Sequence, residues 1–138
     1  MIKSSPMGLM APYKLEWNAE KIWNFKPRKD DIWIVTYPKC GTTLTQEIVW
    51  QIVNEVDLES EESKKPLFVR SPFLELSMLV TAPPPPPDAV LDEKAKFFQD
   101  SGTWTENMKC PRIIKSHLPL AMLPPNLLDT AKVIYVGR

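Results

Sequence analysis

The 138-residue chain is predicted to form an α/β fold, a parallel sheet with flanking helices. Three short apolar stretches rich in β-branched residues indicate buried strands, at residues 31–35, 111–116 and 132–136. The clearest helical pattern covers residues 44–56, with apolar side chains at every fourth position: Leu44, Ile48, Ile52 and Val56. Strands separated by helical stretches favour a parallel sheet, in which ligands bind beyond the carboxyl ends of the strands.

The stretch Thr36-Tyr-Pro-Lys-Cys-Gly-Thr-Thr43 joins the first strand to this helix and resembles a P-loop in its strand–loop–helix arrangement. A helix N-terminus presents unpaired N–H groups and a positive dipole end, so this geometry suits a phosphate. Gly41 permits close backbone approach, Lys39 adds a charge, and Thr42 and Thr43 add hydroxyl donors. The common nucleotide loop instead has its lysine after a second glycine. An ordinary turn with solvated side chains is the alternative.

Composition narrows the class of protein. Lysine and arginine balance aspartate and glutamate at 17 each, so bulk charge points to neither nucleic acid nor an anionic membrane surface. No apolar run reaches transmembrane length, and residues 1–12 make a poor signal peptide. The two cysteines, Cys40 and Cys110, are far apart, which favours free thiols in a reducing compartment. We therefore expect a cytoplasmic protein without nucleic-acid or membrane partners.

The remaining segments are expected to arrange themselves around the sheet. Residues 1–16 are expected to be disordered or loosely packed, and residues 17–138 to belong to a single domain. Two further helices are expected over residues 88–100, from an Asp88 cap to Gly102, and over residues 124–128. A short helix over residues 18–25 would have Asn18 as its cap and an inward apolar face, consisting of Trp17, Ile22, Trp23 and Phe25.

Three segments between these elements are expected to lack regular structure. Residues 57–65 carry acidic and then basic side chains without an apolar period, which indicates a solvated surface loop. Residues 67–80 are apolar but interrupted by Pro72, and we expect an irregular loop packed over the site. The prolines at 83–87 predict an extended surface spacer.

A second group of polar residues follows the strand at 111–116. Lys115 and His117 are two positions apart, so on a strand end both side chains point to the same side. A histidine can accept a proton from a hydroxyl near neutral pH, and a nearby lysine favours the neutral imidazole that acts as base. One alternative is that His117 is a structural histidine. Another is a zinc site formed by His117, Cys40 and Cys110, but the sequence lacks the closely spaced ligand pairs that are typical of zinc sites.

Three motifs in order resemble the cytosolic sulfotransferases. Tyr37-Pro-Lys-Cys-Gly-Thr-Thr43 is similar to their 5′-phosphosulfate-binding loop, and Arg112-Ile-Ile-Lys-Ser-His-Leu-Pro119 to their catalytic-histidine segment. Lys132-Val-Ile-Tyr-Val-Gly-Arg138 is similar to the start of their 3′-phosphate-binding segment. Because these family members run to about twice this length, the resemblance identifies an N-terminal half, incomplete at its carboxyl end.

The resemblance implies sulfonate transfer from 3′-phosphoadenylyl sulfate (PAPS) to the hydroxyl or amine of a small molecule such as a phenol, alcohol or steroid, without a metal. Lys39 would contact the phosphosulfate and stabilise the leaving phosphate, and His117 would be the general base. Lys115 would hold the transferring group or the acceptor, and Arg138 would pair with the 3′-phosphate. The 5′-phosphate would lie on the loop, held by Lys39, Cys40, Gly41, Thr42 and Thr43.

Two positions depart from the family pattern. Leu44 stands where the family has a tryptophan that stacks on adenine, so weaker nucleotide binding is expected. Cys40 stands where many members have serine, although backbone contacts at that position would survive. The last strand would be an edge with exposed apolar faces.

Two rival functions and an open acceptor site accompany this interpretation. A truncated chain that binds nucleotide without turnover is one alternative, and a P-loop kinase is a weaker one. The acceptor site could be an apolar pocket suited to a phenol or steroid, or its residues could be plain core: Trp23, Phe25, Phe73, Leu76, Met78 and Leu79.

Overall fold

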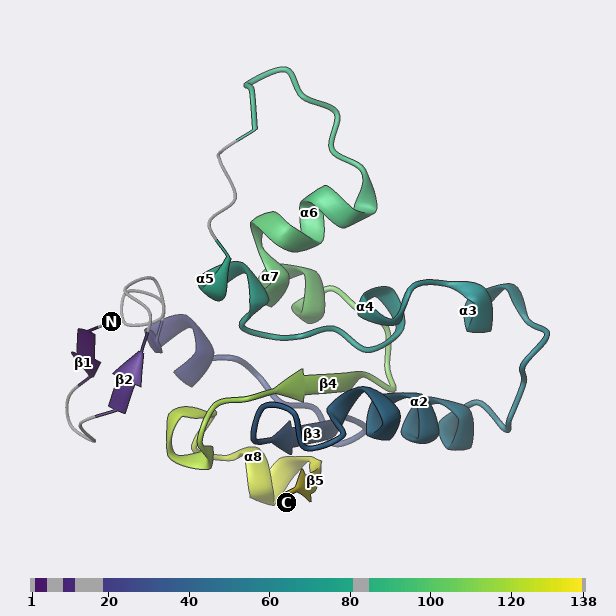
Figure 1. Cartoon of the computed structure of the whole chain (residues 1–138), viewed down its shortest axis with the longest axis horizontal. Coiled ribbons are helices and arrows are strands. Elements are labelled where there is room, and N and C mark those ends of the chain that lie inside the picture. The colour runs from purple at the N-terminus through teal and green to yellow at the C-terminus, as the bar shows by residue number, and fades with distance from the viewer. Residues whose placement is uncertain (1, 5–8, 12–18, 81–84, 138) are drawn as a thin grey trace.

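A computed structural model describes residues 2–4, 9–11, 19–80 and 85–137, and Figure 1 shows its arrangement. Three parallel strands form the sheet in the order β4-β3-β5, which confirms the predicted α/β fold. They are β3 (Ile32–Thr36), β4 (Ile113–Ser116) and β5 (Lys132–Val136). In the register, Val35 lies opposite Ser116 and Thr36 opposite Val136, so the carboxyl ends of the strands meet at one edge.

The central strand β3 is buried on both faces because its side chains alternate between two cores. On one face, Trp33 and Val35 belong to a cluster built with residues such as Phe25, Leu74 and Ile114. On the other face, Ile34 packs with Val49, Trp50 and Ile113 under helix α2. The strand is therefore held on both sides, which fixes where its last residue, Thr36, lies.

Helix α2 (Thr42–Val53) confirms the predicted helix, although it ends before Val56. Its last turn stops at Asn54, and Glu55 and Val56 have positive φ angles that cannot continue a helix. The face toward the protein carries Thr42, Gln46, Val49 and Trp50. The apolar stripe that predicted the helix is instead exposed: Leu44, Ile48, Ile52 and Val56.

The segment expected to be irregular contains short helices. The 57–65 surface segment includes α3 (Glu61–Lys64), which Ser60 caps by accepting from the Ser63 amide. Residues 67–80 include α4 (Leu67–Arg70) and α5 (Leu76–Leu79), so the expectation of an irregular loop was wrong for these turns. Each is only four residues long, too short for a periodic apolar pattern to show in the sequence.

Between α4 and α5 the chain runs beside β4. The Lys115 amide donates to the Pro72 carbonyl (2.8 Å), and the Leu74 amide donates to the Lys115 carbonyl (3.0 Å). Phe73 thereby forms a parallel bridge with Lys115. The outer edge of β4 is covered at this point, directly before His117.

The helix predicted over residues 88–100 is shorter, α6 (Glu93–Gln99), and a second helix that was not predicted, α7 (Ser101–Glu106), follows it. Asp92, rather than Asp88, caps α6 by accepting from the Ala95 amide, and Asp100 caps α7 through the Thr103 amide. Gly102 lies inside α7 and does not end a helix. The two aspartates offer local carboxylate acceptors, which decide the boundaries where periodicity could not.

The helix expected over residues 124–128 begins later. It is α8 (Leu127–Thr130), preceded by the short 3-10 turn η1 (Leu120–Met122). Pro124 lies ahead of the helix, and its carbonyl accepts from the Leu127 amide (3.0 Å).

The N-terminal part contains a feature that the sequence did not predict. Strands β1 (Ile2–Ser4) and β2 (Leu9–Ala11) pair antiparallel, and the rest of residues 1–16 lies outside the described residues, as do Trp17 and Asn18. Residues 19–23 are helical; Ile22 and Phe25 are buried as predicted, whereas Trp23 is half exposed. Of the prolines at 83–87, only those at 85–87 are described, and they are exposed. In the described part of the chain, no helix is both long and apolar enough to cross a membrane.

Candidate active site

The loop between β3 and α2 contains two left-handed residues. Gly41 has a φ of 93° and Lys39 a φ of 64°. A left-handed conformation costs a residue with a Cβ about 1–2 kcal/mol, so Lys39 is held there by the surrounding chain, and such strain is common at functional loops. The first intrahelical donor is the Thr45 amide, which bonds the Gly41 carbonyl (3.0 Å). The preceding amides of α2 therefore have no intrahelical partner and are free to bind an anion.

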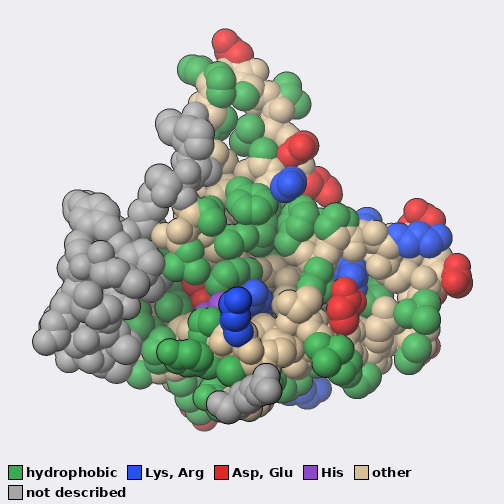
Figure 2. Space-filling view, in the orientation of Figure 1, with side chains coloured by type: hydrophobic (Ala, Val, Ile, Leu, Met, Phe, Trp, Pro, Cys, Tyr) green, Lys and Arg blue, Asp and Glu red, His purple; other side chains and the backbone are tan. Residues whose placement is uncertain are grey.

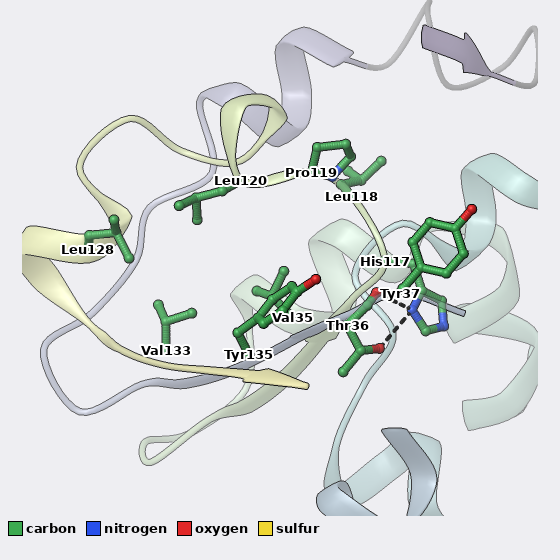
Figure 3. A pocket seen from close by; sticks show the side chains of 10 residues that line it. All are labelled: Val35, Thr36, Tyr37, His117, Leu118, Pro119, Leu120, Leu128, Val133 and Tyr135. Atoms are coloured by element: carbon green, nitrogen blue, oxygen red, sulfur yellow. Dashed lines mark hydrogen bonds between the residues drawn. The ribbon is translucent and has the colours of Figure 1, made fainter. Parts of the chain in front are cut away.

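His117 follows β4 and is bonded to the end of β3. Its Nδ1 lies 2.9 Å from the Thr36 carbonyl oxygen and 3.0 Å from the Thr36 Oγ1 (Figure 3). The same Oγ1 lies 2.6 Å from Oγ1 of Thr42, the first residue of α2. The imidazole is thus connected to the residues that flank the loop on both sides. The sequence pointed to His117 and Thr42, but gave no role to Thr36.

Glu75 holds the backbone at His117. Its Oε1 accepts the His117 amide at 2.6 Å, and the residue is 1% exposed. Burial raises the pKa of Glu75 to about 7, against the opposing hydrogen bond from the His117 amide and the charge of Lys115. Sequence reasoning missed this residue; the available signal was a single carboxylate inside the mostly apolar 67–80 stretch.

Lys115 and His117 both contact the Phe73 ring. The Lys115 Nζ is 4.3 Å from the ring centroid, and the His117 ring meets it edge-on with centroids 5.1 Å apart. Burial lowers the pKa of His117; the Thr36 carbonyl opposes this, and the Lys115 charge lowers the pKa further. Burial also lowers the pKa of Lys115, against the charge of Glu75. The environment therefore favours a neutral imidazole, the form that can accept a proton.

A cavity of about 500 Å³ opens beside His117, between the ends of β3 and β5 and the chain after β4 (Figure 3). Its walls are mostly apolar and include Val35, Leu120 and Tyr135. None of the six residues considered for an acceptor pocket lines it. Of those six, Phe25 and Met78 belong to the core, and Phe73 contacts the His117 ring.

The other candidates lie close to the loop or outside the described chain. Lys39 and Thr43 are exposed, and Leu44 is 66% exposed. Figure 2 shows the single histidine in a hollow beside lysine or arginine side chains. Arg138 lies outside the described residues.

The thiols give no support to the zinc alternative. Cys40 and Cys110 are free, and Cys40 Sγ lies 3.9 Å from the Pro38 carbonyl. Within residues 2–4, 9–11, 19–80 and 85–137, no three histidine, cysteine, aspartate or glutamate side chains gather where they could hold a metal ion.

Comparison with known proteins decides the family. Residues 29–138 match the model described as the sulfotransferase domain. The chain belongs to the sulfotransferase family. Sulfotransferase 1A1 of Canis lupus familiaris is 38% identical over 120 residues, covering 86% of this chain and 35% of the relative. Cytosolic sulfotransferase 1 of Danio rerio is 36% identical over 124 residues, covering 88% and 36%. The chain spans about a third of the length of these curated relatives.

Solved structures agree with the fold. Retinol dehydratase in a complex with retinol and PAP superposes with a TM-score of 0.77 at 29% identity, covering 96% of this chain and 43% of that one. The same enzyme with androsterone and the inactive cofactor PAP gives a TM-score of 0.75 at 26% identity, covering 95% and 42%. The resemblance to the sulfotransferases is thereby confirmed, together with the parallel α/β architecture.

Proposed function

We propose that this chain supplies the donor loop and the base of a sulfotransferase site that uses PAPS as sulfonate donor. The observation that carries the proposal is the hydrogen-bonded connection of His117 to Thr36 and Thr42, the residues on either side of the loop. A general base must lie within reach of the group that reacts, so a base fixed against the donor loop suits group transfer between two bound molecules. PAP complexes of the retinol dehydratase neighbour support a nucleotide of this type.

The residues of the loop fit the phosphosulfate end of PAPS. The free amides at the start of α2 and the left-handed Gly41 offer a concave set of N–H donors. Lys39 adds an exposed ammonium, and Thr42 and Thr43 add hydroxyls. In this proposal Cys40 contributes through its backbone, Leu44 lies toward the adenine, and Arg138 pairs with the 3′-phosphate.

The chemistry assigned to the chain is proton removal and charge stabilisation. When bound, PAPS supplies the sulfonate group on a phosphate that serves as leaving group. His117 accepts the proton of the acceptor hydroxyl or amine through Nε2, the ring nitrogen that faces away from Thr36 (Figure 3). Lys39 offsets the charge that builds on the leaving phosphate, and Lys115 holds the transferring group or the acceptor.

The acceptor in this proposal is an apolar small molecule with a hydroxyl or amine, such as a phenol, alcohol or steroid. The mostly apolar cavity beside His117 supports this class, as do the retinol and androsterone complexes of the neighbouring structures. The reaction would take place in the cytoplasm, where the name of the Danio rerio relative places that protein. Residues 17–138 would form the N-terminal part of the domain.

Calorimetry with adenosine 3′,5′-bisphosphate tests the donor site directly. We expect binding to the 138-residue chain and a loss of at least tenfold in affinity for Lys39→Ala, because a charge-assisted contact contributes about 1.5–3 kcal/mol. Lys29→Ala is the matched control, since Lys29 is also exposed but lies before β3. Equal affinity of the Lys39→Ala and Lys29→Ala variants would show that Lys39 does not bind the nucleotide.

Nucleotide binding without turnover is the second candidate function, favoured by the left-handed loop at the start of α2, whose amides suit an anion independently of the base. An assay with PAPS and a simple phenol separates the two candidates. Sulfonate transfer that is lost in His117→Ala supports the enzyme, whereas tight nucleotide binding without transfer supports the binding function.

A further inference from the structure

We propose that Thr36 is a positioning residue through which donor binding at the loop selects the tautomer of His117 that can act as base. This inference rests on the proposed function, because it requires an anion on the loop beside Thr42. It adds a regulatory link between the donor loop and the base, and assigns that link to a residue that is bonded to both Thr42 and His117.

The ring nitrogen Nδ1 faces two oxygens of the same residue. The Thr36 carbonyl oxygen, at 2.9 Å, can only accept a hydrogen bond, so it favours a proton on Nδ1. The Thr36 hydroxyl, at 3.0 Å, can accept from a protonated Nδ1 or donate to an unprotonated one. The free protein therefore has two competing arrangements, and the direction of the Thr36 hydroxyl distinguishes them.

The Thr42 hydroxyl determines that direction. It lies 2.6 Å from the Thr36 hydroxyl, and only one of the two can donate to the other. An anion on the loop can only accept hydrogen bonds, so the Thr42 hydroxyl donates to the anion. Thr42 is then the acceptor for Thr36, Thr36 is the acceptor for His117, and the Nδ1 proton is fixed.

Burial makes this coupling effective. Thr36 is 2% exposed and Thr42 is 5% exposed, so water cannot easily replace a lost partner between them. Among the described residues, two other groups that contact His117 do not bond its ring nitrogens: Glu75 accepts from the backbone amide, and Phe73 meets the ring edge-on. When the Thr36 hydroxyl changes from donor to acceptor toward Nδ1, the His117 ring therefore has to change its tautomer.

The consequence is an order of events at the site. With its proton on Nδ1, His117 has a free lone pair on Nε2, on the side of the ring away from Thr36 (Figure 3). With its proton on Nε2, the ring cannot accept the acceptor's proton there. Occupation of the donor loop therefore makes the base competent.

The chain has a single histidine, which allows a direct test by nitrogen NMR of labelled imidazole at pH 8. Titration of the intact chain with adenosine 3′,5′-bisphosphate should raise the ratio of the Nδ1-protonated to the Nε2-protonated ring several-fold. Thr36→Val removes the hydroxyl but keeps the carbonyl, so its ring should already carry the proton on Nδ1 and stay unchanged on binding. Thr36→Ser should restore the response.

Thr45→Val is the matched control, because its hydroxyl donates to the Gly41 carbonyl (3.1 Å) on the same helix without reaching His117. It should respond as the unaltered chain does. Nucleotide binding in the unaltered chain without any change of tautomer would overturn this inference and leave the proposed function standing. Absence of nucleotide binding would overturn both. Should Thr36→Val fail to fold, the unaltered chain and Thr36→Ser decide the question by the same measurement.

Discussion

The two faces of helix α2 are not placed as their hydropathy predicts, because the face with the regular apolar stripe is exposed to solvent. Toward the protein it carries the polar Thr42 and Gln46 beside Val49 and Trp50, whereas apolar side chains at every fourth position face outward. The two buried polar residues of this face are bonded: Thr42 to Thr36, and the Gln46 amide to the carbonyl and hydroxyl of Ser71, both at 2.9 Å. The inner face thus combines apolar packing by Val49 and Trp50 with bonded polar groups near the site, and the fourfold apolar spacing does not show which face is inside.

The same contrast extends beyond the helix. Glu47 and Arg70 form two hydrogen bonds of 2.8 and 2.9 Å, with Arg70 also over the Trp50 ring, so α2 is tied to α4 by specific contacts. On the outer face, no such ties are seen for Leu44 or Ile48 within the described residues. One face is therefore organised by pairing that is sensitive to single substitutions, and the other tolerates change.

Breaking a buried pair should have the largest effect. Arg112 and Asp31 bond through two nitrogens and two oxygens, at 2.7 and 2.5 Å, and their side chains are almost fully buried. Arg112→Ala leaves the Asp31 charge without its partner, so we expect a loss of about 3–5 kcal/mol in the free energy of unfolding. Urea denaturation followed by circular dichroism measures it.

An exposed pair provides the control for that measurement. Lys21 and Asp100 lie 2.6 Å apart but are each over 40% exposed, so Lys21→Ala should cost less than about 1 kcal/mol. Similar losses in Arg112→Ala and Lys21→Ala would mean that burial does not determine how much an ion pair contributes to the stability of this protein.

The buried carboxyl of Glu75 should make stability depend on pH. Its pKa is about 7 in the folded chain and 4.5 as the ordinary value, so the folded state holds a proton that the unfolded state has lost. This contribution is fully present below pH 4.5 and declines as the pH rises to about 7, by roughly 3 kcal/mol in total. Glu75→Gln cannot ionise, so its free energy of unfolding, relative to the unaltered chain, should rise across that window.

Denaturation curves between pH 4 and 8 give this difference directly. The lowered pKa of His117 acts in the opposite direction below its ordinary value, since stability then rises with pH, but it is common to both proteins and largely cancels. Glu59→Gln, at an exposed position, should follow the unaltered chain throughout. A flat difference for Glu75→Gln would show that folding does not shift the pKa of Glu75 from its ordinary value.

How far the sequence predicts the structure depends on the kind of signal. Strand β5 was predicted with its exact bounds, and the order of strand, loop and helix around Gly41 followed from local patterns. The facing of α2 could not be predicted, because it depends on partners such as Ser71 that are distant in sequence. The helix boundaries set by Asp92 and Asp100 could not be predicted for a similar reason. Several aspartates in this stretch could cap a helix, and tertiary packing decides which of them does.

The candidate site shows the same division. His117 and Lys39 could be singled out because their residue types carry chemistry. Thr36 and Glu75 could not, since a threonine ending a strand and a glutamate in an apolar stretch acquire a role only when a third element meets them. Roles that depend on contact between distant segments require coordinates.

The smallest expected effect tests the outer face of α2 at the point nearest the nucleotide loop. If adenine lies against Leu44, as the resemblance implies, Leu44→Trp should tighten binding of adenosine 3′,5′-bisphosphate about fivefold or more, since base–aromatic stacking contributes about 1–3 kcal/mol. Ile48→Trp places the same side chain one turn later on the same face, at a residue that is 49% exposed, and should leave the affinity unchanged. Calorimetry compares the two variants. Equal gains would attribute the effect to general hydrophobic contact, whereas a gain confined to position 44 would place the base at the first turn of the helix, beside the free amides of the loop.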